Sequence, residues 1–407
     1  MKRWREESKL FSRPIVVKAM TERAPRSKHA DLSRPDLGEF ARHELAFLGA
    51  PCGDIQRLAA SLTARLAPAG HRVGYVDADH ASGDADAAQT LSPLLQAGAY
   101  AELTDKIHFR RLDERRPIDR FSQPALLAGA SLALVNGNHF RARQQVVLID
   151  PRKSLAHKLD KLTDVQAFVL APGVSAIPDY LQVHLPHHAQ LPHFALADVA
   201  GLATWVQQWL AARQAPLRGL VLAGGLSQRM QTDKGRLRYG PSGREQREVA
   251  AGLLAEVCEE VFVSCRAEQA AGLPAGLQPL PDTFLGLGPL GGILSAFRHD
   301  PNAAWLVLAC DLPFLTAEVL RQLVAGRQPA RLATAFQSPG NEFPEPLITI
   351  FEPRAYPQLL RFLGLGYSCP RKMLINSDVE VLPTPEGEAL RNVNTPAERA
   401  AAEQALG

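Results

Sequence analysis

A glycine-rich stretch followed by two cations is the part of this sequence best suited to chemistry. It begins with Leu222-Ala223-Gly224-Gly225 at the end of an apolar run, and Arg229 and Lys234 follow closely. Adjacent glycines let the backbone approach a nucleotide, and loop N–H groups and cations can neutralise phosphate oxygens. A simple turn is the alternative interpretation of a Gly-Gly pair. The ordered set of glycines, arginine and lysine favours a phosphate site.

Asp311 follows a later apolar run, Trp305–Ala309, with one residue between them. A carboxylate at the tip of a buried strand is suited to hold Mg²⁺ through oxygen, while the phosphates of a nucleotide supply other ligands. The alternative role for Asp311 is a cap of the helix expected to begin near Thr316.

Two further segments place polar residues beside predicted strand ends. Pro281-Asp282 precedes a second glycine-rich turn, Gly288–Ile293, which enters a helix. Leu390–Pro396 is expected to close a short strand and open the last helix, and its Asn394 is available as a cap or as a polar ligand. Open α/β sheets bind ligands outside the carboxyl ends of their strands, which is where the glycine-rich loop is also expected.

Alternating strand and helix patterns must position these residues. In both halves of the chain, short apolar runs alternate with longer helical patterns, which indicates α/β architecture with two three-layer domains. The upstream runs favour buried parallel strands joined by crossover helices. The seam lies near Ala211–Pro216, so the predicted domains cover 36–212 and 217–407 after a basic, poorly ordered tail over 1–35. The predicted strands include Glu44–Leu48, Arg72–Val76, Leu132–Val135, Val146–Ile149, Ala167–Leu170, Gly219–Leu222, Glu260–Ser264, Trp305–Leu308, Leu332–Phe336 and Pro346–Phe351.

Together, the C-terminal motifs resemble the molybdenum cofactor guanylyltransferase family, which joins the nucleotide of GTP to molybdopterin. The resemblance covers about residues 217–407 and includes the Pro346-Leu347 pair. It implies a Rossmann-like nucleotidyltransferase fold. The resemblance also implies that Leu222, Ala223, Gly224 and Gly225 lie along the nucleotide and that Arg229 and Lys234 contact its phosphates. By the same resemblance, Asp282 lies near the nucleoside and Asp311 holds Mg²⁺. Asn394 is expected to lie towards the pterin. Gln231 stands where the family usually has glycine, so Arg229 is a less secure phosphate contact than Lys234.

Residues 43–200 resemble the P-loop adapter protein of molybdopterin-dinucleotide synthesis, which is sometimes fused to the transferase. A working P-loop needs a lysine for the β- and γ-phosphates and a Ser/Thr hydroxyl for Mg²⁺. Asp54 and Ile55 stand at those places, and Asn136 replaces the usual glutamate. A carboxylate at the lysine position would repel a triphosphate, and isoleucine cannot ligate a metal. We therefore expect a degenerate, non-hydrolysing relative that serves in scaffolding, partner docking or cofactor handling.

The composition of the chain excludes several classes of protein. With 45 basic and 42 acidic side chains in 407 residues, the chain lacks the basic excess of a nucleic-acid-coating protein. Five scattered cysteines indicate neither a zinc site nor a disulfide framework, so a reducing cytoplasm is expected. No apolar run is long enough for a membrane span. The histidines at 184, 187, 188 and 193 are interleaved with prolines, which favours a loop over a metal site.

The sequence thus predicts an Mg²⁺-dependent transfer of GMP from GTP to molybdopterin with release of pyrophosphate. Lys234, Asp311 and Arg229 are the predicted catalytic residues, and recipient molybdoenzymes are possible partners. Two alternatives stay open: a cytidylyl- or sugar-phosphate nucleotidyltransferase of the same fold, and a catalytically silent adapter. CTP-using relatives resemble a Leu-Ala-Ala-Gly loop, so Gly224 favours guanine.

Overall fold

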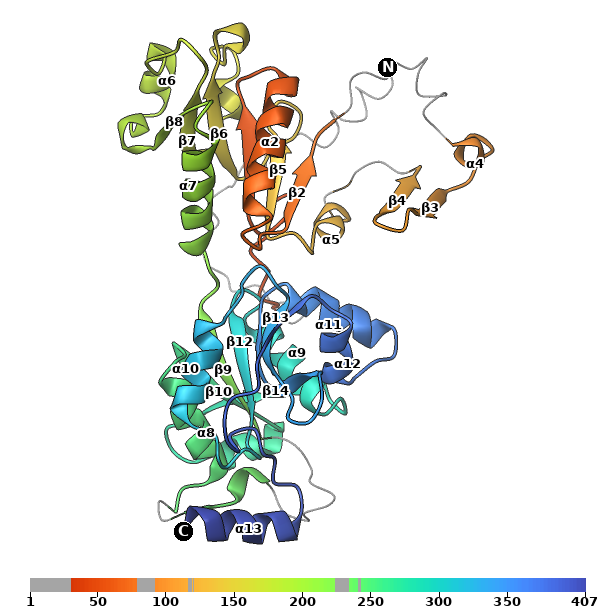
Figure 1. Cartoon of the computed structure of the whole chain (residues 1–407), viewed down its shortest axis with the longest axis vertical. Coiled ribbons are helices and arrows are strands. Elements are labelled where there is room, and N and C mark those ends of the chain that lie inside the picture. The colour runs from red at the N-terminus through yellow and green to blue at the C-terminus, as the bar shows by residue number, and fades with distance from the viewer. Residues whose placement is uncertain (1–30, 79–91, 116–118, 120, 224–233, 241–242) are drawn as a thin grey trace, which may run out of the picture. The chain divides into compact units, whose positions relative to one another are not determined.

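The structure is a computed structural model that describes residues 31–78, 92–115, 119, 121–223, 234–240 and 243–407. By its internal contacts the chain divides into Met1–Ser33 and Arg34–Gly407, and both main sheets belong to the second unit (Figure 1). The predicted basic tail lies almost wholly outside the described residues. The boundaries at 36–212 and 217–407 stay predictions.

The N-terminal sheet is parallel throughout, with strand order β2-β5-β1-β6-β7-β8. Helices α2 (Cys52–Leu66) and α7 (Val199–Ala211) cover one face, where Phe47 packs in a buried core with Ile55 and Val206. On the other face, Phe168 packs in a second core with Leu181 of α6 (Asp179–His184). The strands are β1 (Glu44–Leu48), β2 (Val73–Val76), β5 (Leu132–Asn136), β6 (Gln144–Ile149), β7 (Asp164–Leu170) and β8 (His193–Ala195).

The N-terminal half also contains a small antiparallel hairpin, which forms a separate two-stranded sheet. It consists of β3 (Ala101–Asp105) and β4 (Arg110–Glu114), and the short helices α4 (Pro93–Gln96) and α5 (Gln123–Leu126) flank it in the sequence. Its residues are largely exposed, as expected for two strands without a face to bury.

The C-terminal sheet is mixed, with strand order β11-β10-β9-β12-β14-β13-β15. Strand β14 runs antiparallel to both of its neighbours, and the other pairings are parallel. The strands are β9 (Leu217–Leu222), β10 (Glu260–Cys265), β11 (Gln278–Pro281), β12 (Ala304–Ala309), β13 (Ala333–Gln337), β14 (Pro344–Phe351) and β15 (Val379–Leu382).

Helices cover both faces of this second sheet. Leu254 of α8 (Gln246–Ala255) and Leu320 of α10 (Ala317–Ala325) are buried in the core on one face. The opposite core includes residues of three other helices, α9 (Pro289–His299), α11 (Ala355–Gly364) and α12 (Pro370–Ile375). Every residue of β12 is buried, because helices cover both of its faces. The final helix is α13 (Pro396–Leu406).

The predicted α/β class with two three-layer arrangements is confirmed, and each of the strands listed by residue range in the sequence analysis is present, several of them extended by two or three residues. One local prediction was wrong. The strand predicted within Leu390–Pro396 is irregular backbone up to Thr395, where α13 is capped.

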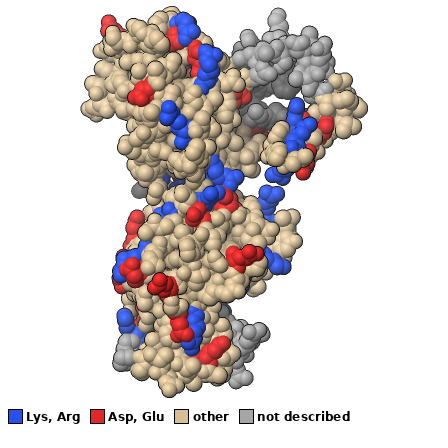
Figure 2. Space-filling view, viewed as in Figure 1, with Lys and Arg blue, Asp and Glu red and all other residues tan. Residues whose placement is uncertain are grey.

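Basic and acidic side chains of the described residues are interspersed on the face drawn in Figure 2. This agrees with a formal net charge of only +3. None of the described helices is both long and apolar enough to cross a bilayer.

Candidate functional site

Three distant segments of the C-terminal half meet at Lys234. Its ammonium Nζ lies 3.1 Å from Asp311 Oδ2 and 2.6 Å from Asn394 Oδ1. The side chains of Lys234 and Asp311 are 22% and 16% exposed, so their charges interact in a partly desolvated place. The structure therefore brings together three of the residues predicted from the sequence.

The sheet explains why Asp311 lies beside the end of β9. Strands β9 and β12 are parallel neighbours, with Ala309 opposite Leu222, so the segments that follow both strands leave the same edge. The thiol of Cys310 donates to the backbone carbonyl of Leu222 at 3.2 Å. Leu222 and Ala223 thus occupy the strand end predicted for them, while Gly224, Gly225 and Arg229 lie outside the described residues.

Asn394 reaches the site because its segment is fixed at two points. The backbone N–H of Val393 donates to the carbonyl of Asp311 at 3.0 Å. The backbone N–H of Asn394 donates to Glu398 Oε2 at 2.7 Å, within the Thr395–Glu398 capping box that starts α13. These bonds hold the Asn394 amide near Lys234 without a β-strand.

One oxygen of Asp311 is left without a partner. Its Oδ1 is buried and has no hydrogen-bond partner among the described residues, although Oδ2 contacts Lys234. A buried carboxylate oxygen without a donor is costly unless a cation or ordered water occupies its lone pairs. Mg²⁺ prefers oxygen ligands, so this oxygen fits such an ion. No group of three or more His, Cys, Asp or Glu side chains in the described part of the chain could hold a metal, so other ligands would have to complete its shell.

Asp282 lies after β11, two strands away from β9 at the same carboxyl edge of the sheet. Ser264 Oγ donates to Asp282 Oδ1 at 2.7 Å, and the Asp282 backbone N–H donates to the carbonyl of Cys265 at 2.8 Å. Burial raises the pKa of Asp282, and the Ser264 bond opposes that shift. Asp282 therefore offers a partly buried acceptor apart from the Lys234 cluster.

A polar pocket of about 510 Å³ adjoins the segment that precedes Asn394. This pocket was not predicted from the sequence. Its wall includes Glu345, whose buried carboxylate accepts from Ser338 Oγ at 2.9 Å and from Arg371 at 3.3 Å. Asn392 also lines it, two residues before Asn394. In the sequence, the residue that could have indicated this pocket is Glu345, which directly precedes the Pro346-Leu347 pair.

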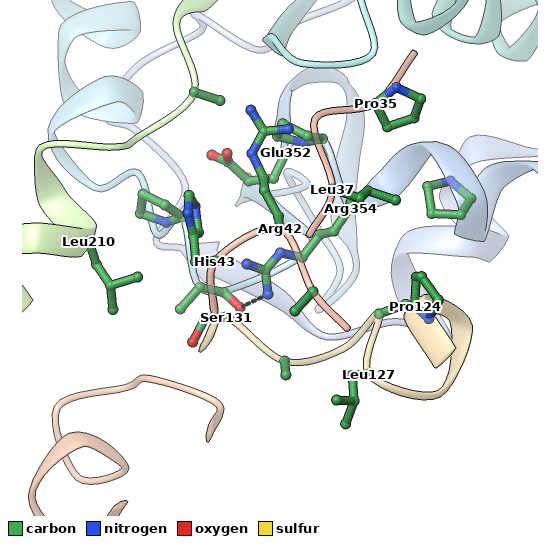
Figure 3. Close-up of a pocket in the computed structure, with 18 of the residues that line it drawn as sticks. Pro35, Leu37, Arg42, His43, Pro124, Leu127, Ser131, Leu210, Glu352 and Arg354 are labelled. Carbon is green, nitrogen blue, oxygen red and sulfur yellow. Dashed lines mark hydrogen bonds between the residues drawn. The ribbon is translucent and has the colours of Figure 1, made fainter. Parts of the chain in front are cut away.

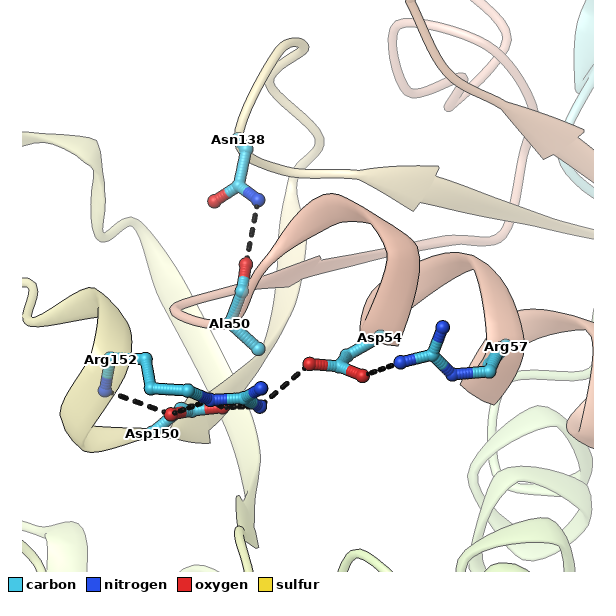
Figure 4. A network of polar contacts seen from close by, with 6 residues as sticks. All are labelled: Ala50, Asp54, Arg57, Asn138, Asp150 and Arg152. Carbon is cyan, nitrogen blue, oxygen red and sulfur yellow. Dashed lines mark hydrogen bonds and ion pairs between the residues drawn. The ribbon is translucent and has the colours of Figure 1, made fainter.

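The loop after β1 differs from a working phosphate loop in structure as well as in sequence. Asp54 lies in the first turn of α2 and forms ion pairs with Arg57 and, at 2.7 Å, with Arg152 (Figure 4). Arg152 also binds Asp150. These contacts modify the charge argument made from the sequence, because arginines neutralise the Asp54 carboxylate. Both arginines of this network are therefore paired with carboxylates.

Ile55 stands where a working phosphate loop has a hydroxyl. Its side chain is fully buried in the core beneath the N-terminal sheet, so it faces away from the loop. Asn136 ends β5 in a buried position, and its Oδ1 accepts from the Asn138 backbone N–H at 3.1 Å. Neither position supplies the hydroxyl or carboxylate that a magnesium-nucleotide site requires.

Comparisons with known proteins identify the C-terminal half of the chain. Residues 219–380 match the family described as the MobA-like NTP transferase domain. The "Probable molybdenum cofactor guanylyltransferase" of Pelotomaculum thermopropionicum is 32% identical over 194 residues, a match that covers 44% of this chain and 88% of that protein. The chain belongs to the molybdenum cofactor guanylyltransferase family. A relative with the same printed name from Rhodopirellula baltica is 33% identical, covering 45% of this chain and 90% of that protein.

Another relative carries a different printed name. The "Molybdenum cofactor biosynthesis bifunctional protein" of Synechocystis sp. is 34% identical over 184 residues, which are 45% of this chain and 52% of that protein. The chain therefore matches about half the length of this relative. The solved structure of "Molybdopterin-guanine dinucleotide biosynthesis protein A" from Archaeoglobus fulgidus has 24% identity and a TM-score of 0.40, and it covers 46% of this chain and 97% of that one. A "MobB protein homolog" from Bacillus stearothermophilus has 22% identity and a TM-score of 0.30, and it covers 42% of this chain and 99% of that one.

Within the family, this chain carries its nucleotidyltransferase domain in the C-terminal half. The Lys234, Asp311 and Asn394 cluster lies at the carboxyl edge of that domain's sheet, where open α/β folds bind ligands.

Proposed function

We propose that this protein transfers GMP from GTP to molybdopterin and releases pyrophosphate. The observation that carries the proposal is the Lys234–Asp311–Asn394 cluster, in which Asp311 Oδ1 is buried and has no partner among the residues that the structure describes. Membership of the guanylyltransferase family supplies the reaction class, because the relatives are named for it.

In the proposed reaction, a terminal phosphate oxygen of molybdopterin attacks the α-phosphorus of GTP. The new P–O bond forms as the bond to the β-phosphate oxygen breaks, and pyrophosphate leaves with that electron pair. Such transfers need alignment of two anionic reactants and stabilisation of charge on the transferring group, with little covalent work by the protein.

Asp311 would hold Mg²⁺ through its unpartnered Oδ1. The ion would neutralise phosphate charge as a Lewis acid. Lys234 supplies a second positive charge at the same edge, held by Asp311 Oδ2 and Asn394 Oδ1 until an anionic substrate competes for it. Arg229 and the glycines at 224 and 225 are proposed to contact the nucleotide phosphates, as the family pattern implies.

Asp282 is proposed to recognise the nucleoside. Its carboxylate is an acceptor at the same edge of the sheet, and Ser264 holds its orientation. A guanine base presents adjacent N–H donors that a carboxylate can accept in pairs. We place the acceptor molybdopterin in the polar pocket beside Asn392, because this pocket adjoins the Asn394 segment and offers Arg371 for anionic groups.

The N-terminal half, proposed as a domain over 36–212, would not use GTP. Asp54 is committed to arginines and Ile55 is buried, so we propose a role in docking a recipient molybdoenzyme or in handling the cofactor.

The experiment combines the purified full chain, molybdopterin and each nucleoside triphosphate in turn, and it measures pyrophosphate release. We expect release with GTP and molybdopterin together, dependence on a divalent cation, and little release with CTP or ATP. Equal rates with CTP would replace guanylyl by cytidylyl transfer, and no release with any nucleotide would favour a silent adapter.

A further inference from the structure

A cavity of about 520 Å³ at the other end of the C-terminal strands has no part in the proposed reaction. Pro301 precedes β12 and Ala215 precedes β9, and both line it, whereas Asp311 follows β12. Its wall is built mainly from proline, alanine and leucine side chains, which include Leu127, Leu210 and Leu360. Its size and lining are those of a small-molecule site.

Two arginines on this wall distinguish the cavity from a simple packing defect. Figure 3 shows the guanidinium groups of Arg42 and Arg354 among the apolar lining. Arg354 Nη1 donates to the carbonyl of Ala330 at 2.9 Å, and Arg42 Nη2 donates to the carbonyl of Asn302 at 2.9 Å. Within the described part of the chain, these arginines bond to carbonyl and amide oxygens and form no ion pair with a carboxylate.

The carboxylates that act on the two arginines already form ion pairs with other arginines. Each acidic residue that acts electrostatically on Arg42 or Arg354 forms an ion pair with a different arginine. These pairs are Asp36 with Arg143, Glu352 with Arg327, Asp300 with Arg218, and Asp378 with Arg72. Glu352 also lines the cavity, but both of its carboxylate oxygens accept hydrogen bonds from Arg327. Arg42 and Arg354 are therefore two positive charges on the wall without an ion pair among the described residues.

Burial makes that arrangement costly in the absence of an anion. Desolvation lowers the pKa of both Arg42 and Arg354, since each guanidinium loses water without gaining a carboxylate partner. His43 on the same wall has its pKa lowered to about 4, by burial first and then by the neighbouring arginines, so it is neutral at pH 7 and does not add to the charge.

We propose that this cavity, which we call the arginine cavity, binds a small organic anion with an apolar body. The anionic head would accept hydrogen bonds from Arg42 and Arg354, whose planar guanidinium groups suit carboxylates and phosphates. The apolar body would cover the proline, alanine and leucine side chains. Because the cavity lies at the opposite strand ends from Asp311, such a ligand binds independently of GTP.

The test uses the full chain and octanoate as a probe, with octanol and octylamine as probes of equal chain length. Calorimetry should show saturable octanoate binding at least about tenfold tighter than that of octanol, because a charge-assisted hydrogen bond adds this much or more. Octylamine should not bind measurably. Saturating GTP should leave the octanoate affinity unchanged.

Two variants locate the site. Arg354→Met and Arg42→Met keep an apolar stem and remove the charge, so each should weaken octanoate binding about tenfold while octanol binding stays the same. Arg321→Met is the matched control, because Arg321 is exposed on α10 and does not line the cavity. Circular dichroism identifies any variant that fails to fold, and the three-probe comparison on the unchanged chain stands without it. Equal affinity for the three probes, displacement by GTP, or octanoate binding unaffected in both folded variants would overturn the proposal.

Discussion

Replacing Asp311 by asparagine tests the central feature of the candidate site. The amide keeps the shape of the carboxylate but loses its charge, so the unpartnered Oδ1 no longer attracts a cation and Lys234 loses its ion pair. Loss of one preorganised electrostatic contact to a transferring group lowers rates by about 10² to 10³, which is about 3–4 kcal/mol. We expect kcat/KM for GTP to fall by that factor.

The effect on stability should be small by comparison. The Lys234–Asp311 pair is partly exposed, and such pairs contribute about 1 kcal/mol or less. In a domain of this size that corresponds to a decrease of about 2–4 °C in Tm at most. A large loss of transfer with a nearly unchanged Tm would separate chemistry from folding.

Asp300→Asn is a close control. Asp300 also forms a 3.1 Å ion pair, with Arg218, and the two side chains are 20% and 23% exposed, but Asp300 precedes β12 instead of following it. Both variants are assayed by pyrophosphate release from GTP with molybdopterin over a range of Mg²⁺ concentrations. The reasoning is refuted if Asp311→Asn keeps more than a third of the parent rate at saturating Mg²⁺. It is also refuted if Asp300→Asn loses as much activity as Asp311→Asn.

Three further predictions follow from the same contacts. Lys234→Ala should raise KM for GTP about tenfold and lower kcat, because it removes a cation from the phosphate site, whereas Lys372→Ala on α12 should leave steady-state kinetics unchanged. Burial raises the pKa of Asp282 in the folded chain above its value in the unfolded chain, so ionisation of Asp282 destabilises the folded state. This destabilisation grows as the pH rises from the unfolded pKa to the folded pKa. Asp282→Asn should therefore raise Tm at pH 7, by an amount that shrinks towards pH 4, and it should weaken GTP binding; a lower Tm at pH 7 would contradict this. GTP should bind the full chain with a stoichiometry of one in calorimetry, because Asp54 and Ile55 replace the lysine and the hydroxyl of a working phosphate loop, and a second tight site would restore the N-terminal half as a nucleotide binder.

Much of the site was predictable because parallel strands end at a common edge. An apolar run followed by a glycine pair, and another followed by Asp311, must bring their next residues together once β9 and β12 pair in register. Asn394 was harder to place, since its segment was predicted as a strand. It reaches Lys234 through the Val393–Asp311 backbone bond and the capping box of α13, which are contacts between segments far apart in the sequence.

The N-terminal loop shows the limit of reasoning from residue types alone. Asp54 in place of lysine predicted a repulsive carboxylate, and this part of the inference depended on Asp54 having no partner. Arg152, 98 residues away in the sequence, supplies one. The replacement of a hydroxyl by Ile55 needed no such correction, because an isoleucine at the start of an amphipathic helix is buried in any fold that uses that helix.

The sequence by itself determined the α/β class, the positions of most strands, and the chemical character of the loop and strand ends, since these depend on local periodicity and on residue type. Only the tertiary structure decided which charges have partners. Within the described part of the chain, it left Asp311 Oδ1 without a donor, paired Asp54 with arginines, and placed Arg42 and Arg354 on an apolar wall whose nearby carboxylates bind other arginines. The physical reason is that a side chain's electrostatic environment is set by atoms within a few ångströms of it, and most of those atoms come from distant parts of the chain.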